Sequence, residues 1–206
     1  MERMDLRKQL KGLYSPSARE PVIVDVPEMG FLMVDGKGDP NTSEEFQDAV
    51  AALYGVSFTI KFALKRSEAS ADHTVMPLEG LWWGEDLDQF SFERKGDWLW
   101  TLLIVQPPHV TQDMVAEAVA ELRRKGKDSP ALSRLRLATF HEGLSVQIMH
   151  VGPYCDEPAT MARMHDFARE QGYELRGKHH EIYLSDPRRT APEKLKTVLR
   201  QPVTRG

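Results

Sequence analysis

The chain has 206 residues, which suits one domain or two small units that share a core. Its formal net charge of −4 gives no general attraction for polyanions, and a single cysteine, Cys155, excludes an internal disulfide and favours a reducing compartment. The first 17 residues, MERMDLRKQLKGLYSPS, lack the apolar core of a signal peptide, and no apolar run approaches the roughly 20 residues of a membrane span. We therefore expect a soluble cytoplasmic protein without a membrane partner.

The first part of the chain predicts an arm, two strands and a helix. Residues 1–19 are expected to form a short polar arm, and strands are expected over 21–27 and 30–40 because apolar runs end there in glycine and proline. Residues 41–55 have the pattern of a helix that is capped by Thr42 or Ser43 and ends at Gly55. The β-branched residues of 56–65 leave open whether this segment continues the helix or becomes a strand.

The rest of the chain alternates strand and helix patterns. Three strands are predicted before the next helix, over 75–84, 89–96 and 98–107. Helices are predicted over 111–126, where Thr111 is the cap, and over 157–173, and two strands over 133–154 turn at Glu142 and Gly143. A strand over 179–190 and a final short helix over 191–203, with Pro192 near its first position, complete the prediction.

The two halves of the chain resemble each other in element order. Met33–Gly36 matches Met149–Gly152, and after one inserted loop residue Ser43–Gly55 matches Thr160–Gly172. This repeat predicts an α+β fold in which duplicated strand–helix–strand–strand units, about 20–105 and 106–203, form one antiparallel sheet with helices packed on it. A central ligand groove is expected between the units, since such interfaces are preferred ligand sites.

A glutamate stands among the strand residues of HHEIYLSDPRRT, residues 179–190. Alternation along a strand places Glu181 and Tyr183 on one face, and we expect Ile182 and Leu184 on the other face to pack under the helices. A carboxylate beside aromatic rings can hold an organic cation, and burial would make it a better general base. The alternative is a solvated strand residue, or one paired with an arginine such as Arg176.

The sequence offers no second chemical motif of comparable strength. His179 and His180 are adjacent on a strand and face opposite ways, so they cannot ligate one metal ion together, and no metal or other cofactor is expected. The basic run at 123–127 is interpreted as a solvated helix end, and the arm before residue 20 is too short for a helix-turn-helix. No nucleic-acid partner is therefore expected.

Long stretches of the sequence resemble a known family. They are FLMVDGKGDPN, EEFQDAVAALYG, PLEGLWW, EGLSVQIMHVGPYCDEPATMARMHDF and HHEIYLSDPRRTAPEKLKTVLRQPV. Together they resemble the GyrI-like small-molecule-binding family over nearly the whole chain from residue 20, and the resemblance implies the same duplicated α+β fold with a groove between the halves. In drug-sensing members of that family a glutamate in the groove receives lipophilic cations, and Glu181 matches that position.

The PLEGLWW stretch most resembles a subfamily described as cyclopropanoid cyclopropyl hydrolases. This resemblance implies hydrolysis of the cyclopropane ring of yatakemycin-type DNA-alkylating natural products, with Glu181 as general base and Tyr183 stabilising negative charge on the ligand oxygen. It also implies planar aromatic or lipophilic cationic ligands, and a monomer or homodimer. The residues expected to bind the ligand are Tyr54, Glu79, Trp82, Trp83 and Tyr154. The alternative is a non-catalytic module that sequesters lipophilic cationic drugs.

Overall fold

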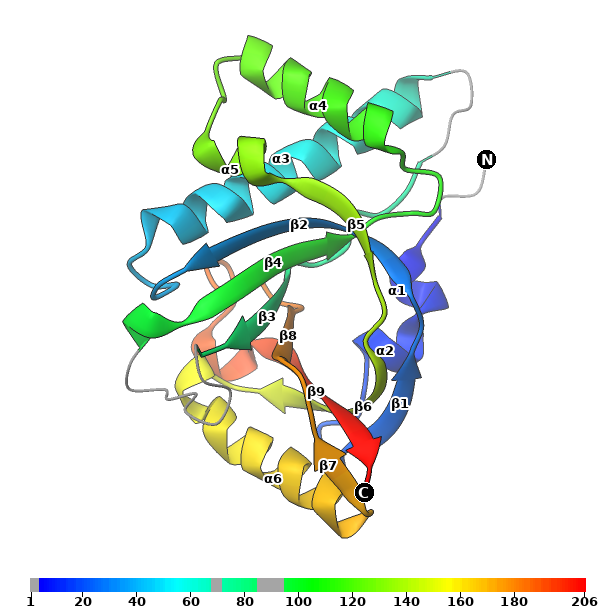
Figure 1. The fold of residues 1–206 in the computed structure, drawn as a ribbon, viewed down its shortest axis with the longest axis vertical. Helices are drawn as coiled ribbons and strands as arrows, with labels where there is room; N and C mark the ends of the chain where they lie inside the picture. Colours follow the sequence, from blue (N-terminus) through cyan, green and yellow to red (C-terminus); the bar gives the residue numbers. More distant parts are fainter. Residues whose placement is uncertain (1–3, 68–71, 85–94) are drawn as a thin grey trace.

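The computed structural model describes residues 4–67, 72–84 and 95–206, and shows one antiparallel nine-stranded sheet with helices packed on it (Figure 1). The strands are β1 (Val22–Val26), β2 (Met29–Lys37), β3 (Glu79–Trp83), β4 (Leu99–Val105), β5 (Arg136–Phe140), β6 (Gly143–Val151), β7 (Tyr173–Leu175), β8 (His179–Tyr183) and β9 (Lys196–Arg205). The helices are α1 (Leu6–Gln9), α2 (Lys11–Tyr14), α3 (Glu44–Arg66), α4 (Gln112–Arg124), α5 (Pro130–Arg134) and α6 (Glu157–Glu170). Short 3₁₀ turns are η2 (Lys95–Asp97), η3 (Tyr154–Asp156) and η4 (Pro192–Lys194). The predicted α+β fold class is confirmed.

The strand order is symmetric about the pair formed by β8 and β3. It runs β1-β6-β9-β8-β3-β4-β2-β5, with β7 paired to β9 outside this path. In each half, one strand before the main helix and two strands after it lie at the centre of the sheet. The edge strands are exchanged between the halves, because β1 pairs with β6 of the second half and β5 pairs with β2 of the first half. The β8–β3 pair is therefore the seam between the two halves.

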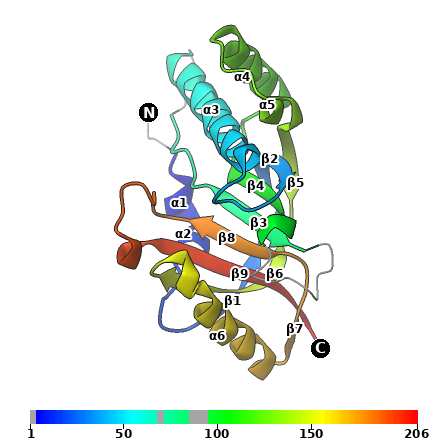
Figure 2. The same cartoon turned by 90° about the vertical axis from the view of Figure 1, so that its left-hand side faces the viewer.

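The helices α3 and α6 pack on the same face of the sheet. Trp82 and Trp100 face α3, where Phe46 lies 6.0 Å and 5.4 Å from their ring centroids, and Leu199 packs in a cluster with Met161 and Met164 of α6. Glu181 of β8 stands between Gly80 of β3 and Leu199 of β9, and residues paired in this way point to the same face of a sheet. Glu181 therefore lies on the face that carries α3 and α6. Figure 2 shows α3 and α6 at opposite ends with β8 between them. No helix in the described ranges is long and apolar enough to cross a membrane.

This arrangement corrects the predicted orientation of β8. The face with Glu181 and Tyr183 carries the helices, whereas Ile182 lies on the opposite face, which the helices α1 and α2 partly cover. Both faces are buried because the sheet is strongly curved, so the apolar residues of β8 alone do not identify the helix side.

Three other predicted elements differ from the structure, and a fourth is not tested. The segment 191–203 forms η4 and β9 instead of a helix, because its β-branched residues lie in a central strand that is buried on both faces. The helix α3 is capped by Ser43 as predicted but continues past Gly55, where the missing side chain lets Leu122 of α4 approach. The N-terminal arm folds into α1 and α2, which bury Leu6, Leu13 and Tyr14. The strand predicted over 89–96 lies largely outside the described residues.

A network of buried charged side chains lies on the sheet face opposite α3 and α6. His180 contacts Glu79 through Nε2 at 2.9 Å and both carboxylate oxygens of Glu142 through Nδ1 at 3.0 Å. Arg200 donates to Glu142 at 3.0 Å, and the hydroxyl of Tyr14 donates to Glu79 at 2.5 Å. The network joins both halves of the sheet and the N-terminal arm.

Within the network, His180 and Glu142 each favour the ionised form of the other. Burial alone would lower the pKa of His180, but the carboxylates of Glu142 and Glu79 outweigh it and raise this pKa to about 9. Burial alone would raise the pKa of Glu142, but His180 and Arg200 outweigh it and lower this pKa to about 2. Two carboxylates therefore face an imidazolium and a guanidinium.

These shifts predict how the stability of the fold depends on pH. The pKa of His180 rises on folding, so its contribution is complete below its ordinary value of 6.5 and is lost as the pH rises towards 9. The pKa of Glu142 falls on folding, so its contribution is complete above 4.5 and is lost towards pH 2. His165 acts at lower pH: its pKa falls to about 4 on folding, so stability is lost as the pH falls below 6.5. We therefore expect urea unfolding to show maximal stability near pH 6.5 and a decline towards pH 9. His180→Gln should remove the decline in the free energy of unfolding above pH 6.5, whereas the control His141→Gln, at an exposed position, should keep it. An unchanged decline in His180→Gln would contradict the assignment of this pH dependence to His180.

Candidate functional site

Glu181 and Tyr183 of β8 lie beside Trp82 of β3 on the sheet face between α3 and α6. Gly80 stands directly opposite Glu181 in the ladder. A Cβ atom at Gly80 would lie 2.7 Å from the indole nitrogen of Trp82 and 3.2 Å from the hydroxyl of Tyr183. The glycine is therefore required because these two side chains pack over its backbone.

A chain of hydrogen bonds holds the carboxylate. The indole N–H of Trp82 donates to the Tyr183 hydroxyl at 3.0 Å, and this hydroxyl donates to Oε2 of Glu181 at 2.6 Å. Burial and the charge of Glu181 raise the pKa of Tyr183 well above its ordinary value, so the phenol keeps its proton. The Tyr183 hydroxyl has one proton, and it donates this proton in a hydrogen bond to Glu181. Tyr183 therefore orients the carboxylate and has no second proton to donate to a ligand.

The other carboxylate oxygen faces His179. Nε2 of His179 lies 3.3 Å from Oε1 of Glu181 but is not aligned for a hydrogen bond. Burial, reinforced by His179, lowers the pKa of the neighbouring His165 on α6 to about 4, so His165 carries no charge at neutral pH.

Glu181 has no lysine or arginine partner in the described part of the chain, although its side chain is only 13% exposed. The expected alternative partner, Arg176, instead donates to the main-chain carbonyls of Glu142 and Val203. A mostly buried carboxylate without a permanent counter-ion can receive a proton or a cationic ligand.

Tyrosines from three elements lie on this part of the structure, two of them close to the carboxylate of Glu181. The ring of Tyr154 meets that of Tyr183 edge to face at 6.1 Å, and Tyr154 is 40% exposed. Burial, with the charges of Glu157 and Glu181, raises the pKa of Tyr154 to about 12. The hydroxyl of Tyr54 accepts the N–H of Leu78, whose carbonyl accepts the N–H of Tyr183. Tyr54, Tyr154 and Tyr183 are thus brought together.

The tyrosines continue into an exposed aromatic row on α3. The ring of Tyr54 stacks on Phe58 at 6.2 Å, and Phe58 stacks on Phe62 at 6.2 Å. Both phenylalanines are exposed. They offer an exposed apolar surface that continues from Tyr54 along α3, which sequence analysis missed because their helical spacing is that of ordinary core residues.

The two tryptophans have different surroundings. Trp82 is buried between Phe46 and Trp98, and its N–H contacts Tyr183. Trp83 lies on the opposite sheet face, where the ammonium group of Lys178 stands 3.3 Å from its ring centroid. The structure therefore brings Trp82, but not Trp83, together with Glu181.

Glu79 also lies on the opposite face. It is fully buried in the charge network with Tyr14 and His180. The structure does not bring Glu79 and Glu181 together, although both are expected at the ligand site, because Glu79 stands opposite Ile182 in the ladder and so faces away from Glu181. Sequence analysis weighs His179 only as a metal ligand and misses it as a neighbour of Glu181. Strand alternation would have identified it, because residues 179 and 181 of one strand share a face. The described residues contain no group of three or more potential metal ligands.

The sequence from residue 19 to 204 matches the family described as the GyrI-like small molecule binding domain. The chain belongs to the GyrI-like family. A comparison with curated proteins finds no match.

Three crystal structures of proteins from Listeria innocua are similar to this chain along its length. An uncharacterized conserved protein is 45% identical with a TM-score of 0.92, covering 98% of this chain and 100% of its own. A hydrolase is 42% identical with a TM-score of 0.87, and another structure of a hydrolase is 43% identical with a TM-score of 0.89, each with the same coverage. The C-terminal domain of EcmrR, at 12% identity and a TM-score of 0.54, covering 91% of this chain and 98% of its own, shares the fold.

The hydrogen-bond chain predicts different effects for two similar substitutions. Tyr183→Phe leaves the Trp82 indole and one oxygen of Glu181 without their partner, so we expect the free energy of unfolding to fall by about 1–3 kcal/mol. Tyr154→Phe should change it by no more than about 0.5 kcal/mol, as usual for a partly exposed side chain. Urea unfolding of both variants measures the difference, and equal effects would argue against the chain of hydrogen bonds.

Proposed function

We propose that the protein is a hydrolase that adds water to the cyclopropane ring of cyclopropanoid DNA-alkylating compounds. The observation that carries this proposal is Glu181, a mostly buried carboxylate that is held by Tyr183 at 2.6 Å and has no lysine or arginine partner among the described residues. The 42% and 43% identity to hydrolases supports the reaction class. The PLEGLWW resemblance supports the specific substrate.

The proposed chemistry assigns the water to Glu181. The water oxygen forms a bond to the ring carbon while Glu181 takes a proton from the water. The ring carbon–carbon bond breaks, and its electron pair moves through the conjugated dienone to the carbonyl oxygen, which then takes up a proton. The net change is the addition of one water molecule. Because Oε2 accepts from Tyr183, Oε1 is the oxygen left to receive the proton.

The structure changes which tyrosine is proposed to meet the developing negative charge. Tyr183 uses its proton on Glu181, whereas Tyr154 is 40% exposed and has an elevated pKa of about 12, so its hydroxyl stays protonated at neutral pH. We therefore assign stabilisation of the ligand oxygen to Tyr154. The Tyr54–Phe58–Phe62 row would stack on the flat aromatic part of the ligand.

A second candidate function is binding without turnover. The same carboxylate, with Tyr154 and Tyr183 close to it, has the composition of a site that holds a lipophilic cation by charge and ring quadrupoles. In that function Glu181 would serve as a counter-ion, and neutral alkylators would be held only by stacking.

The central test is Glu181→Gln, which preserves the shape of the side chain and removes its charge and basicity. We expect the wild-type protein to convert a cyclopropane-containing alkylator into a product heavier by one water molecule, measured by mass spectrometry. Glu181→Gln should lower this turnover by roughly 10²–10⁴-fold, as is typical for loss of a general base. The thermal midpoint should be preserved, because removing a buried charge relieves its desolvation cost.

The control is Trp83→Ala, which alters an aromatic residue of the same strand pair on the other sheet face and should leave turnover unchanged. Binding of a cationic ligand that is weakened by Glu181→Gln, with no product in the wild type, would favour the sequestering function. Wild-type turnover and affinity in Glu181→Gln would reject both functions for this residue.

A further inference from the structure

A cavity of about 430 Å³ lies on the sheet face opposite Glu181. It is lined by β5, by the turn that follows β5, and by the segment between β7 and β8. Leu81 and Thr101, which stand opposite each other in the ladder of β3 and β4, also line it, and strand alternation places Leu81 on the face of Glu79 and Trp83. None of the residues of the Glu181 site contributes to this lining.

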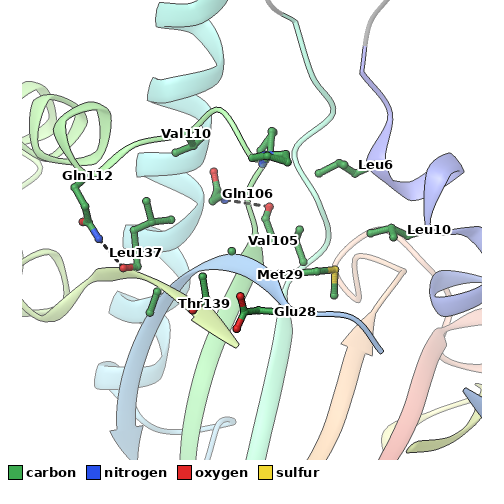
Figure 3. Close-up of a pocket in the computed structure, with 14 residues that line it drawn as sticks. Leu6, Leu10, Glu28, Met29, Val105, Gln106, Val110, Gln112, Leu137 and Thr139 are labelled. Atoms are coloured by element: carbon green, nitrogen blue, oxygen red, sulfur yellow. Dashed lines mark hydrogen bonds between the residues drawn. The ribbon is translucent and has the colours of Figure 1, made fainter. Parts of the chain in front are cut away.

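The inner surface of this cavity is apolar. Met33, Leu81, Ala138 and Phe140 line it, and they can pack against the hydrocarbon part of a ligand. The larger hollow beside α1, shown in Figure 3, also has an apolar wall, but Glu28 is the one charged residue of its described lining. Of these two hollows, only the smaller one is therefore lined by cationic side chains.

Arginine and lysine side chains line the cavity from two sides. Arg136 of β5 donates to both carboxylate oxygens of Asp35, at 2.7 and 3.1 Å, and is thereby paired. Arg176 and Lys178, from the segment between β7 and β8, also line the cavity, and neither forms an ion pair with an acidic residue of the described chain. Their positive charges are therefore available to an anion in the cavity.

These two cationic groups are held in place by the protein. Nε and Nη2 of Arg176 donate to the main-chain carbonyls of Val203 and Glu142, at 3.1 and 2.7 Å, which leaves Nη1 without an acceptor in the described part of the chain. The ammonium group of Lys178 lies 3.3 Å from the ring centroid of Trp83. Donors that are already positioned lose little conformational freedom when a ligand binds, so they favour binding more than mobile surface side chains do.

The one acidic residue of the described lining does not balance these charges. Glu142 lines the cavity, but its carboxylate already contacts His180 and Arg200, each at 3.0 Å. Within that buried network two carboxylates face two cations, so the network supplies no surplus negative charge to Arg176 or Lys178.

The surroundings of Lys178 favour an anion beside it. Partial burial lowers the pKa of Lys178, the carboxylate of Asp35 opposes this effect, and the charge of Arg136 adds to it. A bound anion would attract Lys178 and Arg136 together and would offset the repulsion between them.

We propose that this cavity is a second ligand site, separate from Glu181, that binds lipophilic carboxylates. A carboxylate has two acceptor oxygens and no donor, so one oxygen can accept from Nη1 of Arg176 and the other from the ammonium group of Lys178. The hydrocarbon part of the ligand lies against Met33 and Leu81. The proposal goes beyond hydrolysis at Glu181 and does not depend on it, because the two sites share no residue.

Three probes with the same alkyl chain separate charge from apolar contact: octanoate, octanol and octylammonium, each added to the full chain at neutral pH. We expect calorimetry to show that octanoate binds more tightly than octanol, because octanol lacks the charge. The methyl NMR signals of Met33, Leu81 and Ala138 should shift on addition of octanoate but not of octylammonium, which the cations repel. Equal affinity for octanol and octanoate, unshifted signals with octanoate, or the same shifts with octylammonium would overturn the proposal.

Variants of Lys178 test the cationic group directly. Lys178→Met keeps an unbranched side chain and removes the charge, and it should weaken octanoate about three- to thirtyfold, less than for a fully buried charged hydrogen bond because Lys178 is only half-buried. Octanol affinity should be unchanged in Lys178→Met, which also shows that the cavity is still folded, and Lys178→Arg should keep most of the octanoate affinity.

The matched control is Lys194→Met, which removes an exposed lysine of η4 that does not line the cavity and should leave octanoate affinity unchanged. Glu181→Gln should also leave it unchanged. Unchanged octanoate affinity in Lys178→Met, or an equal loss in Lys194→Met, would overturn the proposal. A loss in Glu181→Gln would place octanoate at the other site and would overturn it as well.

Discussion

The structure depends on the placement of one charged imidazole at the seam between its halves. His180 contacts Glu79 of β3 and Glu142 of the β5–β6 turn, and Arg200 links Glu142 to the main chain of the N-terminal arm at Leu13. These contacts fix the register of β8 against β3 on one face. Because successive residues of a strand face opposite ways, the same register places Glu181 on the other face, between α3 and α6.

The buried glutamates differ in what surrounds them, and this decides what each can do. Glu142 faces an imidazolium and a guanidinium, which lower its pKa to about 2 and make it a poor proton acceptor. Glu79 accepts from Tyr14 and His180 within the same network. Glu181 has a phenol and a histidine beside it but no lysine or arginine partner in the described ranges. Of these three glutamates only Glu181 is partly exposed, whereas removing a partner from the network would leave a charge buried and unpaired.

Local sequence patterns predicted the fold class, the caps of Ser43 and Thr111, and the common face of Glu181 and Tyr183, since these depend on neighbouring residues. They did not predict β9, whose residues are buried on both faces by partners far away in the sequence. They also placed Glu79 beside Glu181, because the register between β3 and β8 is set by long-range pairing that a repeat alignment does not contain. The helices of the N-terminal arm were not predicted either, because Tyr14 and Leu13 contact Glu79 and Arg200, which are far away in the sequence.

The most direct test of this account is the protonation state of His180, measured through its ring ¹⁵N chemical shifts at pH 8. The account predicts an imidazolium with protons on both nitrogens, because carboxylates contact Nδ1 and Nε2 and raise the pKa to about 9. A neutral His180 with one protonated nitrogen at pH 8 would contradict the claim that a charged clamp at the seam fixes β8 and, with it, the position of Glu181.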